Sequence, residues 1–304
     1  MGLYDTSIGT LLIGIFFNTY LYGLVTYQFA AYYKSDFGDR PAIKYMVLFL
    51  FILDTIHSAT SIYMAWIYCV ENYGNPTALT IAVWPYTFTP IATALAALVT
   101  QVFLGYRILR LSNSKVLFGV VILLAIPSFA LGMACGIKAW IIKVLVELPK
   151  INNIVTAWLA MQVGCDAFIT ATLTIILSRS RTGFRKTDTV LNRLIRGAIQ
   201  TGLFAGIFSL GDLVSFLSWP DTNLYGMFAV PIGRIYTNTL LDTLLTRTEL
   251  KNKMAGTYDV GSSIGWAPAE TTRNIQLEVR KDVQQTCDTG SFEADGKVPP
   301  TMAL

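Results

Sequence analysis

Ionisable side chains interrupt the long apolar segments of this chain. The last segment, NLYGMFAVPIGRIYTNTLLDTLLTR (223–247), carries Arg234 about midway along it. A guanidinium in the middle of a membrane-spanning helix has no water around it, so it needs an acidic partner. Asp54, Asp166 and Asp212 interrupt other apolar segments. We predict that Arg234 pairs with Asp166 or Asp54 in the interior of a helical bundle.

The predicted polar interior has further members at a similar depth. Residues three apart are neighbours on a helix, so His57 lies one turn from Asp54 on the same face. A carboxylate left over by the ion pair is then expected to be protonated or hydrogen-bonded to His57. The candidate binding site or buried polar network consists of Asp54, His57, Gln101, Asp166, Arg234 and Asn238. Such a group could line a small-molecule pocket or a proton or ion path, or it could only hold helices in register.

The residue inventory argues against catalysis. His57 is the single histidine, and a zinc hydrolase site built from several imidazoles is therefore excluded. The four cysteines are scattered and contain no CxxC pair. No Ser or Cys nucleophile stands out beside Asp54 and His57. We predict a protein that is not an enzyme, with no catalytic residue, metal site or cofactor.

The composition places these residues in a membrane. The 304 residues are 53% hydrophobic and only 14% charged, whereas soluble domains average about 25% charged residues. Seven apolar runs are long enough to cross a bilayer as helices, which needs about 20 residues each. They are expected near 8–30, 45–68, 86–109, 116–140, 153–178, 194–218 and 224–246. The predicted fold is all-α, a polytopic membrane protein with seven transmembrane helices.

Basic residues alternate between the connections and predict the orientation. The first, third and fifth connections with their flanks carry most of the Lys and Arg residues, while the second and sixth carry none. By the positive-inside rule the N-terminus lies outside and the C-terminus is cytosolic. Tryptophans are expected in an interfacial belt at the outer ends of the spans, at positions 66, 84, 140, 158 and 219.

Two further patterns concern packing and domain organisation. The pairs Gly132/Gly136 and Gly202/Gly206 have the GxxxG spacing that allows close helix approach, and we expect them to pack within the chain. From about residue 251 the composition turns polar without periodicity. The chain is thus expected to comprise a seven-helix domain (1–250) and a disordered cytosolic tail (251–304).

Several segments resemble a known family. TGFRKTDTVLNRLIRGAIQTGLFAG (182–206) and PIGRIYTNTLLDTLLTR (231–247) are similar to the C-terminal domain of a fungal, mainly basidiomycete, family of seven-span membrane proteins. LIGIFFNTYLYGLVTYQ (12–28), LDTIH (53–57) and NYGNP (72–76) also resemble it, so the similarity extends over roughly 8–250. The family is catalogued only as a domain of unknown function. The resemblance therefore implies a topology and a fungal origin, and no activity.

Three classes of function fit these features. A receptor or sensor fits seven spans, an outside N-terminus and a basic third cytosolic loop, although GYRILR (105–110) replaces a DRY-like triplet. A small-solute or proton transporter or channel would use the charges at the middle of the membrane. A scaffold would hold anionic lipids at its basic loops. The expected location is the plasma membrane or an endomembrane of the secretory pathway. Expected partners are membrane lipids, a small-molecule ligand and a cytosolic protein at 179–196 and the tail, with no nucleic acid.

Overall fold

The computed structural model describes residues 5–254 except 36–37, 76–80, 145–146, 148–149, 180–184 and 220–221. Apart from an isolated antiparallel bridge between Ile81 and Val144, the regular structure in this part of the chain is helical. The predicted all-α class is thereby confirmed. The predicted disordered tail from 251 lies outside the described residues, apart from its first four positions.

Seven long helices account for most of the described residues. Their bounds are α1 Thr10–Lys34, α2 Pro41–Trp66, α3 Trp84–Ser112, α4 Lys115–Ile142, α5 Asn152–Arg179, α6 Arg185–Ser218 and α7 Leu224–Met254. Short π-helical turns, η1 (Asp5–Gly9) and η2 (Ile67–Glu71), precede α1 and continue α2. All seven helices are longer than the predicted apolar runs, and the difference is largest for α6, which begins at Arg185, and for α7, which continues to Met254. The segment proposed for partner binding, 179–196, therefore lies largely within α6.

Local sequence signals explain several helix ends. Pro41 and Pro85 stand in the first turns of α2 and α3, where the missing amide hydrogen costs nothing. The connection from α3 to α4 is only two residues long, because Asn113 adopts the left-handed conformation with φ 54° and ends α3. Asparagine tolerates that conformation better than most residues. Lys143 ends α4 in the same way, with φ 58°.

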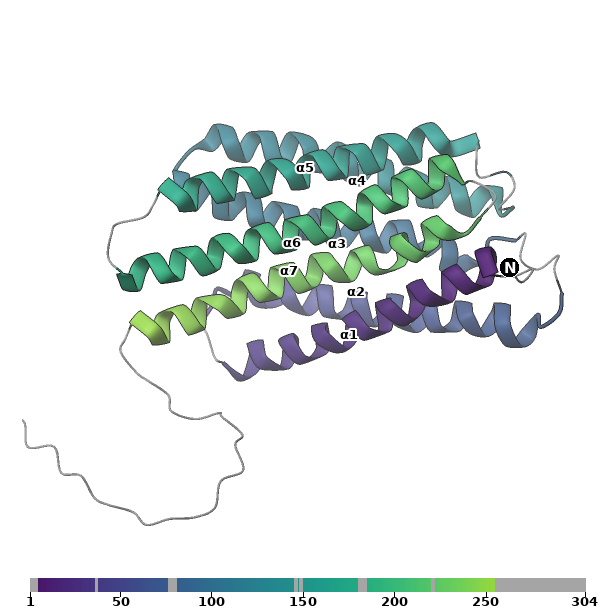
Figure 1. Cartoon of the computed structure of the whole chain (residues 1–304), viewed down its shortest axis with the longest axis horizontal. Coiled ribbons are helices and arrows are strands. Elements are labelled where there is room, and N and C mark those ends of the chain that lie inside the picture. The colour runs from purple at the N-terminus through teal and green to yellow at the C-terminus, as the bar shows by residue number, and fades with distance from the viewer. Residues whose placement is uncertain are drawn as a thin grey trace, which may run out of the picture. The chain divides into compact units, whose positions relative to one another are not determined.

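The helices run side by side and alternate in direction, so the described part of the bundle has two ends (Figure 1). At the N-terminal end, the amide of Asn223 donates to the carbonyl of Thr6 at 3.0 Å. At the opposite end, called the tail end, the Tyr32 hydroxyl donates to Asp39 at 3.0 Å and Arg247 donates to the same carboxylate at 3.4 Å. The odd-numbered connections thus share one end, as the alternating basic residues require.

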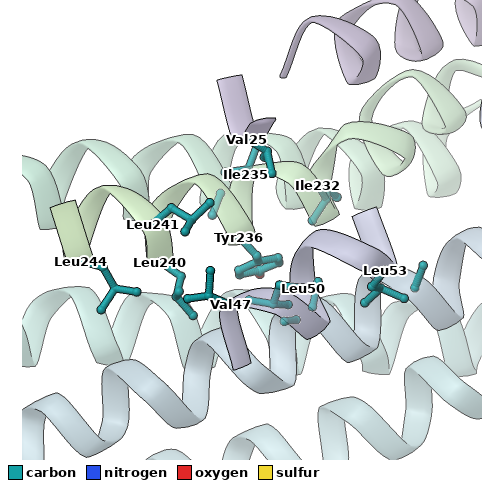
Figure 2. Close-up of a cluster of buried hydrophobic side chains, with 14 of the residues drawn as sticks. Val25, Val47, Leu50, Leu53, Ile232, Ile235, Tyr236, Leu240, Leu241 and Leu244 are labelled. Carbon is teal, nitrogen blue, oxygen red and sulfur yellow. The ribbon is translucent and has the colours of Figure 1, made fainter. Parts of the chain in front are cut away.

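Helix α7 is enclosed by the other helices. It packs against α1, α2, α3 and α6. It contributes Ile232, Ile235, Leu240, Leu241 and Leu244 to the largest apolar cluster, which also contains Val25 of α1 and Val47, Leu50 and Leu53 of α2 (Figure 2). Helix α7 thus contacts four of the other six long helices.

Six helices, α1–α6, are long and apolar enough to cross a membrane, by length and composition alone. Their outer surfaces carry large apolar side chains, among them Phe16, Leu123 and Phe204, which are 68%, 70% and 58% exposed. The chain thus has the helices of an integral membrane protein. The predicted seventh span, 224–246, is not among the six, because α7 combines Arg234 with a run of threonine and asparagine.

The tryptophan and glycine predictions can be compared with the packing. Four of the five tryptophans are exposed near the N-terminal end, namely Trp66, Trp84, Trp140 and Trp219. Trp158 is only 5% exposed, so its assignment to an interfacial belt was wrong. Its indole packs over Gly132 of α4, where a Cβ atom would come within 2.8 Å of Nε1. Gly136 packs on Ile91 and Gly202 on Thr170, which confirms packing within the chain at these positions, whereas Gly206 has no such neighbour.

Candidate functional site

Helices α2, α3 and α7 are joined by a buried polar group, called here the Arg234 cluster, of Asp54, His57, Ser58, Thr89 and Arg234. Arg234 is 1% exposed and forms an ion pair with Asp54, whose side chain is fully buried. Its Nε donates to the Ser58 hydroxyl at 3.3 Å, and its Nη2 lies 2.5 Å from Nδ1 of His57. All three nitrogens of the guanidinium therefore contact α2.

The hydrogen bonds determine the tautomer of His57. Arginine has no acceptor, so Nδ1 of His57 must accept from Arg234. The proton of the neutral imidazole then sits on Nε2, which donates to the Thr89 hydroxyl at 3.1 Å. Thr89 in turn donates to the carbonyl of Pro85 at 3.2 Å. A directed chain of donors thus runs from Arg234 through His57 to α3.

The predicted pairing of Arg234 is present, and Asp54 is the partner. The expected hydrogen bond between His57 and a surplus carboxylate is not found among the described side chains, because Nδ1 faces Arg234 and Nε2 faces Thr89. Asp166 does not contact the guanidinium. It belongs to a separate group.

This second group, the Asp166 cluster, connects α3, α5 and α7 and consists of Gln101, Gln162, Asp166 and Tyr236. The Tyr236 hydroxyl donates to Oδ2 of Asp166, and Gln101 donates to Oδ1 at 2.8 Å. Gln162 donates to the Tyr236 hydroxyl at 2.9 Å. No described basic side chain pairs with Asp166, so neutral donors alone stabilise this carboxylate.

Asn238 stands apart from both clusters. Its side-chain amide donates to the carbonyl of Arg234 at 2.9 Å and to the carbonyl of Leu21 in α1 at 3.4 Å. It fastens α7 to α1 and does not line the polar interior, contrary to the prediction. Of the six predicted residues, three therefore lie in the Arg234 cluster, two in the Asp166 cluster and one at a helix contact.

A cavity of about 70 Å³ opens between α3, α4, α5, α6 and α7 toward the N-terminal end. We call it the N-terminal cavity. Its polar and aromatic lining residues are Tyr86, Thr89, Trp158, Asp212, Phe216 and Tyr225. From the sequence, Asp212 was predicted only as a possible partner for Arg234, and the aromatic residues were not predicted. Their signal was weak, because aromatic residues near helix ends are common in membrane proteins.

A smaller cavity of about 30 Å³ lies toward the tail end and is called the tail-end cavity. Gln101, Asp166 and Tyr236 contribute to its wall, together with Arg107 and Thr243. A volume of roughly 10–15 Å³ suffices for one water molecule, so this space fits one or two. Arg234, Asp54 and His57 line neither of the two cavities.

Thr89 connects the N-terminal cavity with the Arg234 cluster. It lines the cavity and accepts the hydrogen bond of His57. A molecule in the cavity that competed for this hydroxyl would change the hydrogen bonding of His57 and, through it, of Arg234.

Comparison with known proteins adds one family match. Residues 162–249, which include both C-terminal segments of the resemblance described above, match a family of unknown function, DUF6534. The match covers α6 and most of α5 and α7. No curated protein matches the chain, and no solved structure does.

Proposed function

We propose that this protein is a seven-span membrane sensor that binds a small molecule in the N-terminal cavity and reports its presence at the tail end. In this proposal α7 is the seventh span, with its charge neutralised by Asp54 instead of being excluded from the membrane. The N-terminus lies outside and the tail is cytosolic. We also infer a fungal origin from the resemblance of the motifs, and no enzymatic activity.

One observation carries the proposal: Thr89 belongs both to the cavity wall and to the hydrogen-bond chain of Arg234. Arg234 ties α2 to α7, so a change at Thr89 reaches two helices that run to the tail end. Helix shifts of about 1–2 Å at such contacts are a known means of transmitting a signal. A cytosolic partner at 179–196 and the tail would read the shift.

The test measures motion at the tail end. The full chain receives spin labels at Lys44→Cys in α2 and Lys115→Cys in α4, both exposed, with Cys69 and Cys287 replaced by Ser. Distances are measured by pulsed electron paramagnetic resonance in nanodiscs, with a panel of small alcohols, carboxylates and amines. We expect at least one class to shift the distance by about 1 Å or more.

Thr89→Val supplies the decisive variant, because it removes the hydroxyl and keeps the shape. It should abolish the shift even at compound concentrations that saturate the cavity. Thr87→Val is the matched control, since that hydroxyl bonds only to the carbonyl of Trp84 in its own helix. A shift that survives Thr89→Val, or a panel without any effect, would contradict the proposed sensor.

A transporter is the second candidate, supported by the presence of two cavities in opposite halves of the bundle. The tail-end cavity is lined by Asp166 and Arg107, and both cavities are bounded by α3, α5, α6 and α7 at different levels along these helices. Passage would require α7 to open one half while the other is closed. Flux of the same compounds, or of protons, into liposomes that contain the protein would favour this function, and binding without flux would favour the sensor.

A further inference from the structure

We propose that the N-terminal cavity binds a small alkylammonium group. This inference deepens the proposed function by naming the chemical class of its ligand. The argument rests on the charge, the aromatic walls and the size of the cavity.

The charge comes from Asp212. Its side chain lines the cavity and is 5% exposed, and no hydrogen bond or ion pair joins it to another residue in the described part of the chain. The carboxylate lies close to Tyr86, Tyr225 and Cys135, none of which is a cation. An ionised carboxylate in an apolar site is unfavourable until a cation accompanies it. Arg234 cannot neutralise Asp212, because its guanidinium is bonded to Asp54, His57 and Ser58 of α2.

The walls are aromatic and come from four helices. Tyr86 of α3, Trp158 of α5, Phe216 of α6 and Tyr225 of α7 all line the cavity. The ring of Tyr225 stands edge-on to Tyr86 at a centroid distance of 6.5 Å and to Phe216 at 5.2 Å. Rings at right angles present faces in several directions. Such a cage attracts alkylammonium ions, because the negative faces of aromatic rings stabilise a cation that is weakly hydrated.

The proline inside α3 leaves one backbone acceptor free in this region. Pro90 lines the cavity and has no amide hydrogen, so it gives no helical hydrogen bond to the carbonyl of Tyr86. That carbonyl and the Thr89 hydroxyl supplement the carboxylate of Asp212. An N–H group of a primary or secondary amine could donate to either oxygen.

The volume limits the ligand. The cavity measures about 70 Å³, roughly half of an engineered apolar cavity of about 150 Å³ that takes up benzene. A methylated ammonium head fits this space, whereas a large amine would extend out of it. A bare calcium ion does not suit the walls, because it needs about 6–8 oxygen ligands and Asp212 is the only carboxylate among the described residues that line the cavity.

Binding is tested on the full chain in phosphatidylglycerol nanodiscs by calorimetric titration with tetramethylammonium, and with tert-butanol as a neutral compound of similar shape. We expect saturable binding of the cation and binding of the alcohol at least about ten-fold weaker. Asp212→Asn should lower the affinity for the cation by about 30-fold or more, since it removes one partner of a buried charge pair. Glu71→Gln is the control, because Glu71 is an exposed carboxylate at the same end of the bundle and should leave the affinity unchanged.

Tyr225→Leu gives an independent measurement if the Asp212 variant does not fold. Loss of one aromatic ring from the cavity wall should lower the affinity for the cation by roughly ten-fold and leave the affinity for the alcohol unchanged. Equal binding of cation and alcohol, or equal effects of the Asp212 and Glu71 substitutions, would overturn the assignment, as would the absence of saturable binding.

The lipid composition of the nanodiscs distinguishes a free ammonium ion from a lipid headgroup as the ligand. Phosphatidylcholine nanodiscs should lower the apparent affinity for tetramethylammonium if a lipid headgroup occupies the cavity, and should leave it unchanged if the ligand is a free ion. The result is also separable from the sensor test. If the cation binds without moving the labelled helices, the alkylammonium assignment stands and the sensor function is refuted. If only a neutral compound moves the helices, the sensor function stands and the alkylammonium assignment is refuted.

Discussion

Breaking the ion pair between Arg234 and Asp54 should be the most damaging small change in the bundle. Arg234→Met keeps an unbranched flexible side chain but removes the guanidinium and its charge, which leaves Asp54 fully buried without a cation. Removal of one partner of a buried pair costs about 3–5 kcal/mol. An isolated charge at the centre of a membrane helix costs about 2.5–3.5 kcal/mol on insertion scales, which gives a similar magnitude.

The reverse single change and the double change complete a thermodynamic cycle. Asp54→Leu leaves the guanidinium without its carboxylate and should cost about as much as Arg234→Met. In the double variant no charge remains, and the loss reduces to the hydrogen bonds with His57 and Ser58, each worth about 0.6 kcal/mol between membrane helices. The double variant is therefore expected to be more stable than either single one.

The assay is reversible unfolding by dodecyl sulfate in mixed micelles, followed by tryptophan fluorescence. Arg110→Met is the control, because Arg110 is exposed in the last turn of α3 and makes only a distant contact with the ring of Tyr106 at 6.0 Å. It should change the free energy of unfolding by at most about 0.5 kcal/mol. Two single effects that simply add up in the double variant, or an Arg234 effect no larger than that of Arg110, would refute the reasoning.

Two other substitutions have matched comparisons within the chain. Asp166→Asn should change the free energy of unfolding by at most about 1 kcal/mol, far less than the loss of the charge at Asp54. The amide can still bond Gln101 and Tyr236, and no buried cation is left behind. A loss as large as that of the Asp54 variant would show that Asp166 has a cationic partner. Gly132→Ala should destabilise the bundle by about 1–3 kcal/mol, because the new Cβ would lie 2.7 Å from Ala94 and 2.8 Å from the Trp158 indole. Gly119→Ala on the same helix is the control and should be neutral, because its new Cβ meets nothing within 4 Å. The same unfolding assay compares the two variants.

From the sequence alone, the positions of the polar residues along their helices could be predicted, but not their neighbours. Arg234, Asp54 and Asp166 were all placed in the middle of their segments, and the depth of a residue follows from its position along a helix. Which helix lies opposite Arg234 depends on lateral packing, which depth does not reveal. Asp54 and Asp166 were therefore equal candidates, and only the structure distinguishes them.

The separation into two clusters has a simple geometric cause. Successive residues of a helix are rotated by about 100°, so Arg234 and Tyr236 point in nearly opposite directions from α7. Arg234 faces α2, and Tyr236 reaches α5. Position along a helix does not distinguish these directions, so the predicted site combined two groups that lie on different sides of α7. Trp158 was misplaced for a related reason, since a tryptophan at the end of a span can face lipid or the helix beside it.

The polarity of α7 has a consequence for how the protein is made. A helix with an arginine at its centre gains little from lipid on its own, so its entry into the bilayer depends on helices that are already there. Ribosomes synthesise α2 long before α7, and the carboxylate that neutralises the arginine is thus in place when the last helix emerges. In the proposed seven-span form, α7 would accordingly be the last helix to insert, between helices that are already in the bilayer. Late translation would then be the step at which misassembled chains fail to complete the bundle.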